Sequence, residues 1–185
     1  GRALVPCRQD DMHNVGRLCA GQDENNACTS LACASPAQLL AGYENGDVVV
    51  VAPDRAQSGM GHAVTINGIL KMEPVTFGVE GVQAAWQTTG TPVDCVKLAI
   101  YEILGKKPDL LLSGINHGPN LGSDVIYSGT VAAAMEGTLE GLPALAVSSA
   151  CFDWRQFDGA AVQAMDVAES ALAGGWPEGL LLNLN

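Results

Sequence analysis

From residue 47 onward, the sequence alternates short hydrophobic runs with longer amphipathic stretches. The runs "DVVVVAPD", "DLLLSG", "ALAVSS" and "GLLLNLN" have the length and the aliphatic composition of buried strands. Strands that alternate with helices form βαβ units, which pair their strands in parallel through right-handed crossovers. We therefore predict an α/β fold with three layers, in which a mostly parallel sheet carries helices on both faces.

Helix boundaries are marked most clearly in the stretch that begins at residue 91. Thr91 can cap a helix, Pro92 suits its first position, and Asp94 complements the positive end of the helix dipole. Gly105 is suited to end this helix. Further elements are predicted as helices over residues 128–141 and 157–175, and as short extended pieces in a hairpin excursion over residues 62–90.

The first 46 residues differ from the rest of the chain, because they show little periodicity. An α/β domain needs a first strand here, but the run "ALV" at residues 3–5 is too weak to predict one. At the other end, the chain stops directly after an apparent core strand. We therefore expect an atypical N-terminal segment over residues 1–46, and an α/β domain over residues 47–185 that is truncated at its C-terminus.

Composition excludes several classes of function. No apolar run approaches the roughly 20 residues that span a bilayer, and no signal sequence is recognisable, so we expect a cytoplasmic protein without a membrane partner. The formal net charge of -11 argues against binding a nucleic-acid polymer. If the protein binds a phosphate, backbone N–H groups or a metal ion must hold it.

The six cysteines do not follow a metal-binding or disulfide pattern. Their spacings match neither a zinc ribbon nor a zinc finger, and Cys95 and Cys151 lie within apolar segments. Buried or free thiols in a reducing compartment are the favoured interpretation. A zinc site is the weaker alternative.

The stretch "SGINHGPNLGSD", residues 113–124, is the first candidate site. It follows a predicted strand of an open parallel sheet, where ligands bind beyond the carboxyl ends of the strands. Asn116 and Asn120 can offer oxygens to a hard metal ion or amide donors to an oxyanion. The next helix starts at residues 128–130, where free N–H groups favour an anion. The alternative is a turn that only reverses the chain, with Ser128 serving only as a cap.

A second loop, "APDRAQSGMGH", also follows a predicted buried strand, so its polar residues should reach the same edge of the sheet. Ser58 can bind a metal ion or a phosphate oxygen, although it can equally be an ordinary loop hydroxyl. Asp54 and Arg55 are interpreted as a structural salt bridge. His62 can contact a substrate or act as an acid, but a single histidine of this kind is more often structural.

Four stretches, "VVVVAPDRAQSG", "GTPVDCV", "PDLLLSGINHGPNLGSDVIYSGTVAAAMEG" and "GLPALAVS", resemble the signatures of the SurE survival-protein family. The resemblance covers about residues 47–185. It implies a Rossmann-like fold and a divalent-metal-dependent phosphatase that acts on nucleoside 5'-monophosphates, on 3'-monophosphates, and on other small phosphate esters. It also implies a homo-oligomer, either a dimer or a tetramer, in the full-length protein.

The resemblance further implies a Mg²⁺ or Mn²⁺ site. Its neutral ligands would be Ser58 and Asn116. The family also uses an acidic pair in an N-D-D-G turn after the first strand, and that motif is absent here. The only adjacent acidic pair available is Asp10 and Asp11, which would serve as metal ligands and catalytic residues. Substrate and phosphate contacts would come from His62, Asn120, Ser128, Gly129 and Thr130.

Two functions from different classes therefore remain open. The first is the metal-dependent nucleotidase. The second is a catalytically inactive, phosphate-binding α/β fragment that lacks the acidic metal ligands, since Asp10 and Asp11 can equally form a solvated acidic turn. A Rossmann oxidoreductase is disfavoured, because no G-x-G-x-x-G motif follows a predicted strand.

Overall fold

The computed structural model describes residues 2–6, 47–76, 82–150 and 157–185. Seven strands form one sheet in the order β3-β4-β2-β1-β5-β6-β7. Every neighbouring pair is parallel except β3 and β4, which are antiparallel. The strands are β1 (Arg2–Pro6), β2 (Asp47–Pro53), β3 (Met72–Val75), β4 (Val82–Thr88), β5 (Leu110–His117), β6 (Ala144–Ser149) and β7 (Leu181–Leu184).

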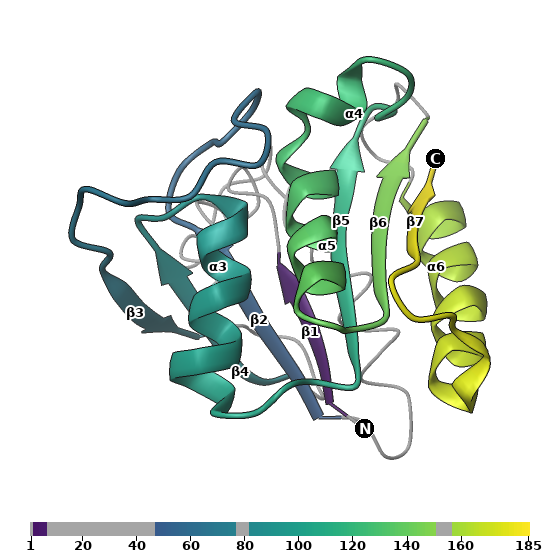
Figure 1. Cartoon of the computed structure of the whole chain (residues 1–185), viewed down its shortest axis with the longest axis horizontal. Coiled ribbons are helices and arrows are strands. Elements are labelled where there is room, and N and C mark those ends of the chain that lie inside the picture. The colour runs from purple at the N-terminus through teal and green to yellow at the C-terminus, as the bar shows by residue number, and fades with distance from the viewer. Residues whose placement is uncertain (1, 7–46, 77–81, 151–156) are drawn as a thin grey trace, which may run out of the picture.

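Helices cover both faces of this sheet, which confirms the predicted three-layer α/β fold (Figure 1). Helices α3 and α5 pack on one face, and α6 packs on the other. The helices are α3 (Pro92–Leu98) with its π-helical continuation η1 (Ala99–Leu104), α4 (Asp124–Tyr127), α5 (Gly129–Leu139), and α6 (Asp158–Ser170) with its π-helical continuation η2 (Ala171–Gly175). None of the helices described is long and apolar enough to cross a membrane.

Strand β2 shows why the sequence needs a continuous valine run. Val48 and Val50 belong to the core on the α6 side, whereas Val49 and Val51 belong to the core on the α3 and α5 side. Because successive side chains of a strand point to opposite faces, a strand covered on both faces must be apolar at every position. All four valines are at most 5% exposed.

Strand β1 is the main difference from the sequence prediction, which found no strand near the N-terminus. Arg2–Pro6 lies between β2 and β5, with Ala3 aligned with both Val48 and Leu110. A central strand is stabilised by hydrogen bonds to two neighbours, so a short segment of weak intrinsic preference can still be extended. Residues 7–46 lie outside the described part, and the expected atypical segment stays a prediction there.

The region predicted as a hairpin excursion contains β3 and β4. The two strands pair in antiparallel fashion, with Met72 opposite Thr88 and Val75 opposite Ala85. Strand β4 also pairs in parallel with β2, so the excursion extends the main sheet and places β3 at its edge.

Cys95 is a free thiol in the core, as its apolar surroundings predicted. Burial, with a further contribution from the charge of Asp94, raises the pKa of the thiol well above its usual value. The group therefore stays protonated and behaves as a small hydrophobic side chain. The other five cysteines lie outside the described residues.

The start of α3 is built as predicted, on Thr91 and Asp94. The Thr91 hydroxyl accepts a hydrogen bond from the Asp94 N–H at 3.1 Å, and the Asp94 carboxylate accepts one from the Thr91 N–H at 2.8 Å. Asp94 is only 2% exposed and also accepts bonds from the N–H and hydroxyl of Thr65, at 3.0 and 2.6 Å. One buried carboxylate thus joins α3 to the loop that follows β2.

Replacing this carboxylate should destabilise the fold. We expect Asp94→Ala to lower the free energy of unfolding by about 2–4 kcal/mol, because it removes a helix cap and leaves buried N–H donors without an acceptor. Chemical denaturation followed by circular dichroism measures the change. The exposed Asp166→Ala is the matched control and should stay within about 0.5 kcal/mol of the wild type. Equal stability of the two variants would show that the buried contacts contribute nothing.

Candidate functional site

A pocket of about 300 Å³ opens at the carboxyl ends of the parallel strands. The arrowheads of β1, β5 and β6 point to this end of the sheet, where α4 also lies (Figure 1). Strand order changes direction between β1 and β5, since β2 and β4 lie on one side of β1 and the later strands on the other. Open α/β sheets bind ligands at such a switch point. The pocket lining includes six of the predicted site residues: Ser58, Asn116, Asn120, Ser128, Gly129 and Thr130.

The end of β5 turns Asn116 toward this pocket. The pairing of β5 with β6 shifts between Ser113 and Asn116, where three steps along β5 correspond to two along β6. Such a bulge bends a strand and redirects its side chains. Gly114 is required there, because a Cβ atom would lie 2.3 Å from the Val147 carbonyl oxygen.

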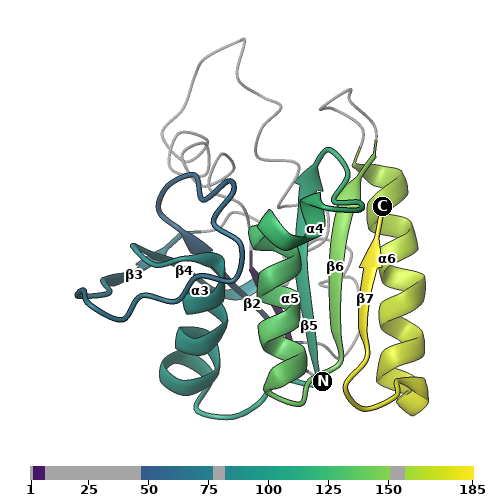
Figure 2. The same ribbon diagram turned by 45° about the horizontal axis from the view of Figure 1, so that its top comes forward.

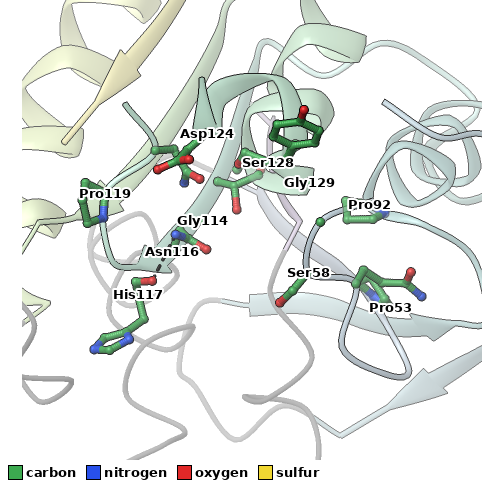
Figure 3. A pocket seen from close by; sticks show the side chains of 16 residues that line it. Pro53, Ser58, Pro92, Gly114, Asn116, His117, Pro119, Asp124, Ser128 and Gly129 are labelled. Atoms are coloured by element: carbon green, nitrogen blue, oxygen red, sulfur yellow. Dashed lines mark hydrogen bonds between the residues drawn. The ribbon is translucent and has the colours of Figure 1, made fainter. Parts of the chain in front are cut away.

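The side chain of Asn116 is oriented by its own loop. Its amide nitrogen donates hydrogen bonds to the carbonyl oxygens of Gly118, at 2.8 Å, and of His117, at 3.2 Å (Figure 3). Because the nitrogen is turned toward the loop backbone, the amide oxygen lies on the opposite side of the amide group. That orientation suits a side chain that presents an oxygen to a cation.

Ser58 lies across the pocket from Asn116, on the loop that follows β2 (Figure 3). The loop is fixed against the end of α4 by a hydrogen bond from the Gly61 N–H to the Tyr127 carbonyl oxygen at 2.9 Å. The contact is close, because a Cβ atom at Gly61 would lie 2.9 Å from the Ile126 carbonyl oxygen. Figure 2 shows this loop beside the start of α5.

The first residues of α5, where the sequence predicted an anion-binding site, line the pocket. Ser128 caps the helix, and its hydroxyl accepts a hydrogen bond from the Val131 N–H at 3.1 Å. The N–H groups of Gly129 and Thr130 have no partner within a helix at these positions, and both residues line the pocket. A Cβ atom at Gly129 would lie 2.9 Å from Pro92, so glycine keeps α5 close to α3.

Asn120 is held more firmly than a surface loop residue. Its side-chain nitrogen donates to the Ser148 hydroxyl at 2.7 Å, and its own N–H donates to the Asn185 side-chain oxygen at 2.7 Å. Asn183 donates to its carbonyl oxygen at 2.9 Å. Asn120 therefore lines the pocket and also ties the loop to β6 and β7, and its expected contact with substrate stays a prediction.

His62 is not among the residues that line the pocket. Its Nε2 atom lies 2.6 Å from Glu136 Oε2, on α5. Lys97 Nζ of α3 lies 2.5 Å from the other oxygen of the same carboxylate. Burial raises the pKa of Glu136, but hydrogen bonds from Lys97 and His62 outweigh that effect and hold the pKa below its usual value. A substrate contact by His62 stays a prediction.

The pocket contains residues that the sequence analysis did not single out, notably Gln57, His117, Asp124 and Tyr127. Gln57 donates to the Gly90 carbonyl oxygen at 3.3 Å, and the His117 ring packs edge-on against Phe157. Asp124 begins α4, four residues after Asn120, and its acidic side chain was the signal that could have identified it. The predicted salt bridge between Asp54 and Arg55 is present, with Arg55 Nε 3.2 Å from Asp54 Oδ1.

As far as the structure describes it, the pocket lacks the cationic side chains that often bind phosphate. Among the described lining residues none is Lys or Arg, and the helix N–H groups are the main positive feature. Ser58 and Asn116 supply hard oxygen atoms, and Asp124 supplies a carboxylate. Within the described ranges, no three His, Cys, Asp or Glu residues gather to hold a metal ion. Asp10 and Asp11, the expected acidic ligands, lie outside those ranges.

Comparison with known proteins places these features in one family. The family model described as "Survival protein SurE" matches residues 27–185, so the match begins ahead of residue 47, where the resemblance was expected to start. A relative from Synechococcus sp. (strain RCC307), named 5'-nucleotidase SurE, is 73% identical over 139 residues, which are 75% of this chain and 50% of that protein. A relative of the same name from Prochlorococcus marinus (strain MIT 9303) is 54% identical over 169 residues, which are 91% of this chain and 62% of that protein.

The fold is shared with a solved structure. The crystal structure of the SurE protein from Aquifex aeolicus superposes with a TM-score of 0.75 at 37% sequence identity, and the match covers 99% of this chain and 64% of that one. This similarity supports the Rossmann-like architecture expected from the sequence. The chain thus spans about half to two thirds of the length of these relatives.

The Glu136 cluster makes a pH-dependent prediction. Because the pKa of Glu136 is lowered from 4.5 in the folded protein, its stabilising effect is complete above that value and is lost as the pH falls through the folded pKa. Glu136→Gln should lower the free energy of unfolding by about 1–3 kcal/mol at pH 7, because hydrogen bonds to a charged group are replaced by neutral ones.

The difference between wild type and Glu136→Gln should shrink as the pH falls below 4.5. Denaturant unfolding of both proteins across that range measures it. A difference that stayed constant with pH would show that the charge of Glu136 does not stabilise the fold.

Proposed function

This chain belongs to the survival protein SurE family, and we propose that it provides the active site of a 5'-nucleotidase. The reaction is the metal-dependent hydrolysis of nucleoside 5'-monophosphates to nucleoside and phosphate. Nucleoside 3'-monophosphates and other small phosphate esters are further proposed substrates. The observation that carries the proposal is the pocket in which Ser58 and Asn116 face the first residues of α5.

Phosphate binding is proposed at the start of α5. A phosphoryl group there would accept hydrogen bonds from the N–H groups of Gly129 and Thr130, next to the positive end of the helix dipole. Ser128 orients these donors by capping the helix. The same donors would stabilise the charge that develops on the equatorial oxygens of the phosphoryl group during in-line attack.

The donor atoms in the pocket fit a hard divalent cation, Mg²⁺ or Mn²⁺. Asn116 would bind it through the amide oxygen, whose orientation is set by the two bonds of its nitrogen, and Ser58 through its hydroxyl. When bound, such an ion neutralises phosphate charge and polarises the attacking group. Two neutral ligands hold a dication weakly, so carboxylates are needed to complete the site.

Asp10 and Asp11 are the proposed carboxylates and catalytic residues. They lie outside the described residues, but they follow β1 closely along the chain. Strand β1 is central and pairs with β5, which carries Asn116. Because parallel strands end at the same edge, a chain leaving β1 at Pro6 starts from the edge of the sheet where the pocket lies.

Three further expectations from the sequence, a substrate contact, a location and an oligomeric state, are proposed together with this activity. Asn120 is proposed to contact the substrate, since it lines the pocket. We also propose a cytoplasmic location, and a homo-oligomer, either a dimer or a tetramer, for the full-length protein.

The second candidate is a phosphate-binding domain without catalytic activity. It is favoured by one observation, namely that Asp124 is the only carboxylate among the described residues that line the pocket. If Asp10 and Asp11 do not reach the pocket, the phosphate wall at the start of α5 remains but the metal ligands are incomplete. The two candidates therefore differ in metal-dependent turnover.

Replacing a proposed ligand separates the candidates. Mn²⁺-dependent release of phosphate from AMP at near-neutral pH should fall at least about a hundredfold in Asn116→Ala, and similarly in Asp11→Ala, because each change removes an oxygen that holds the cation. The matched control is Asn67→Ala, an exposed asparagine outside the pocket, which should retain the wild-type rate. The assay is colorimetric detection of inorganic phosphate.

Activity that is indifferent to both Asn116→Ala and Asp11→Ala would reject the proposed site. A wild-type protein that binds inorganic phosphate but releases none from AMP or from an aryl phosphate would support the inactive domain instead.

A further inference from the structure

The loop that carries Ser58 is exposed, so its position depends on a few attachments to the rest of the fold. Before Ser58, the Asp54 N–H donates to the Thr88 carbonyl oxygen at 2.7 Å, and Gln57 donates to Gly90. After Ser58, the Gly61 N–H donates to the Tyr127 carbonyl oxygen at 2.9 Å. These contacts attach the loop to β4, to the turn before α3 and to the end of α4.

His62 makes the side-chain attachment of this loop to α5. The Glu136 carboxylate can only accept hydrogen bonds, so the Nε2 atom of His62, at 2.6 Å, carries the proton. Glu136 is 5% exposed and is fixed from its other side by Lys97. A hydrogen bond between a ring nitrogen and a buried carboxylate is charge-assisted and short, and is stronger than the backbone bond beside it.

Glu136 lies on the same helix as the residues of α5 that line the pocket, so its bond to His62 links the loop to that helix. Gly129 and Thr130, at the start of the same helix, line the pocket. Glu136 is seven residues after Gly129, which is about 10 Å along an α-helix. His62 is four residues after Ser58 in the loop. Helix α5 therefore carries both the proposed anion-binding residues and the attachment point of the loop.

We propose that His62 is a positioning residue, whose hydrogen bond to Glu136 holds the Ser58 loop at a fixed distance from the N-terminal end of α5. The importance of that distance rests on the proposed function, since Ser58 is the cation ligand and α5 is the phosphate wall. His62 thus acts on the site through the loop rather than by touching substrate.

Amide hydrogen exchange at Gly61 tests the proposal without relying on activity. The Gly61 N–H is bonded to the carbonyl oxygen of Tyr127, so its exchange rate reports whether the loop stays against the end of α4, directly before α5. His62→Leu removes the donor and keeps an apolar side chain, and should raise the Gly61 exchange rate about tenfold or more. His62→Gln keeps an N–H donor near the position of Nε2 and should restore exchange to near the wild-type rate.

Tyr101→Phe is the matched control. It removes a hydrogen bond of 2.6 Å to Glu140, a carboxylate that Lys97 also contacts, but it leaves His62 and Glu136 in place. The Gly61 exchange rate should not change in this variant. A global loss of stability would instead raise exchange throughout the chain, including the Leu111 N–H, which bonds to the Pro143 carbonyl oxygen in a distant part of the sheet.

Binding of Mn²⁺ alone, measured by titration calorimetry, supplies the second readout. The apparent Kd for Mn²⁺ should rise about tenfold in His62→Leu and return toward wild type in His62→Gln. Unchanged Gly61 exchange in His62→Leu, or equal acceleration in His62→Leu and His62→Gln, would overturn the positioning role. A wild-type protein that neither binds Mn²⁺ nor hydrolyses AMP would overturn the proposed function, and Gly61 exchange would still decide the role of His62.

Discussion

Parallel strand pairing determines where polar site residues can gather in this fold. The strands β2, β1, β5 and β6 run side by side in one direction, so their carboxyl ends meet at a single edge. Both faces of the sheet are covered by helices, and the strand side chains within those faces are committed to the two cores. Polar groups can gather only where the strands end. Ser58 follows β2 and Asn116 ends β5, and the two lie across one pocket for that reason.

Helix α5 lines the pocket at this edge of the sheet and also contacts α3 and the loop that carries Ser58. Its first turn supplies N–H groups to the pocket, and Gly129 allows it to lie close to α3. Farther along, Glu136 receives Lys97 from α3 and His62 from the loop. Donors for an anion and an attachment for the loop thus share one helix. Under the proposed function, a pocket without Lys or Arg in its described lining would bind an anion through backbone N–H groups and a bound cation.

Local signals made much of this structure predictable. The valine run of β2, the Thr91 cap of α3 and the Ser128 cap of α5 each depend on a few neighbouring residues, and all three are confirmed. Strand β1 was not predictable, because its stability comes from hydrogen bonds to β2 and β5 rather than from its own residues.

The contact between His62 and Glu136 was also not predictable from the sequence. It joins residues 74 positions apart, and nothing near either residue signals the other. Asn120 was identified as a pocket residue, but its bonds to Ser148, Asn183 and Asn185 come from two other strands and the end of the chain. Contacts of this kind are set by the packed fold, and sequence pattern carries little information about them.

In the proposed site, one pocket holds a cation and a phosphoryl group side by side. A crystal structure of the protein with Mn²⁺ and inorganic phosphate, with the metal located by anomalous scattering, tests this arrangement most directly. We expect Mn²⁺ about 2.0–2.6 Å from the Asn116 amide oxygen and the Ser58 hydroxyl. We also expect phosphate oxygens within about 3.2 Å of the Gly129 and Thr130 nitrogens. Mn²⁺ bound away from Asn116, or phosphate bound away from the start of α5, would contradict the proposed site.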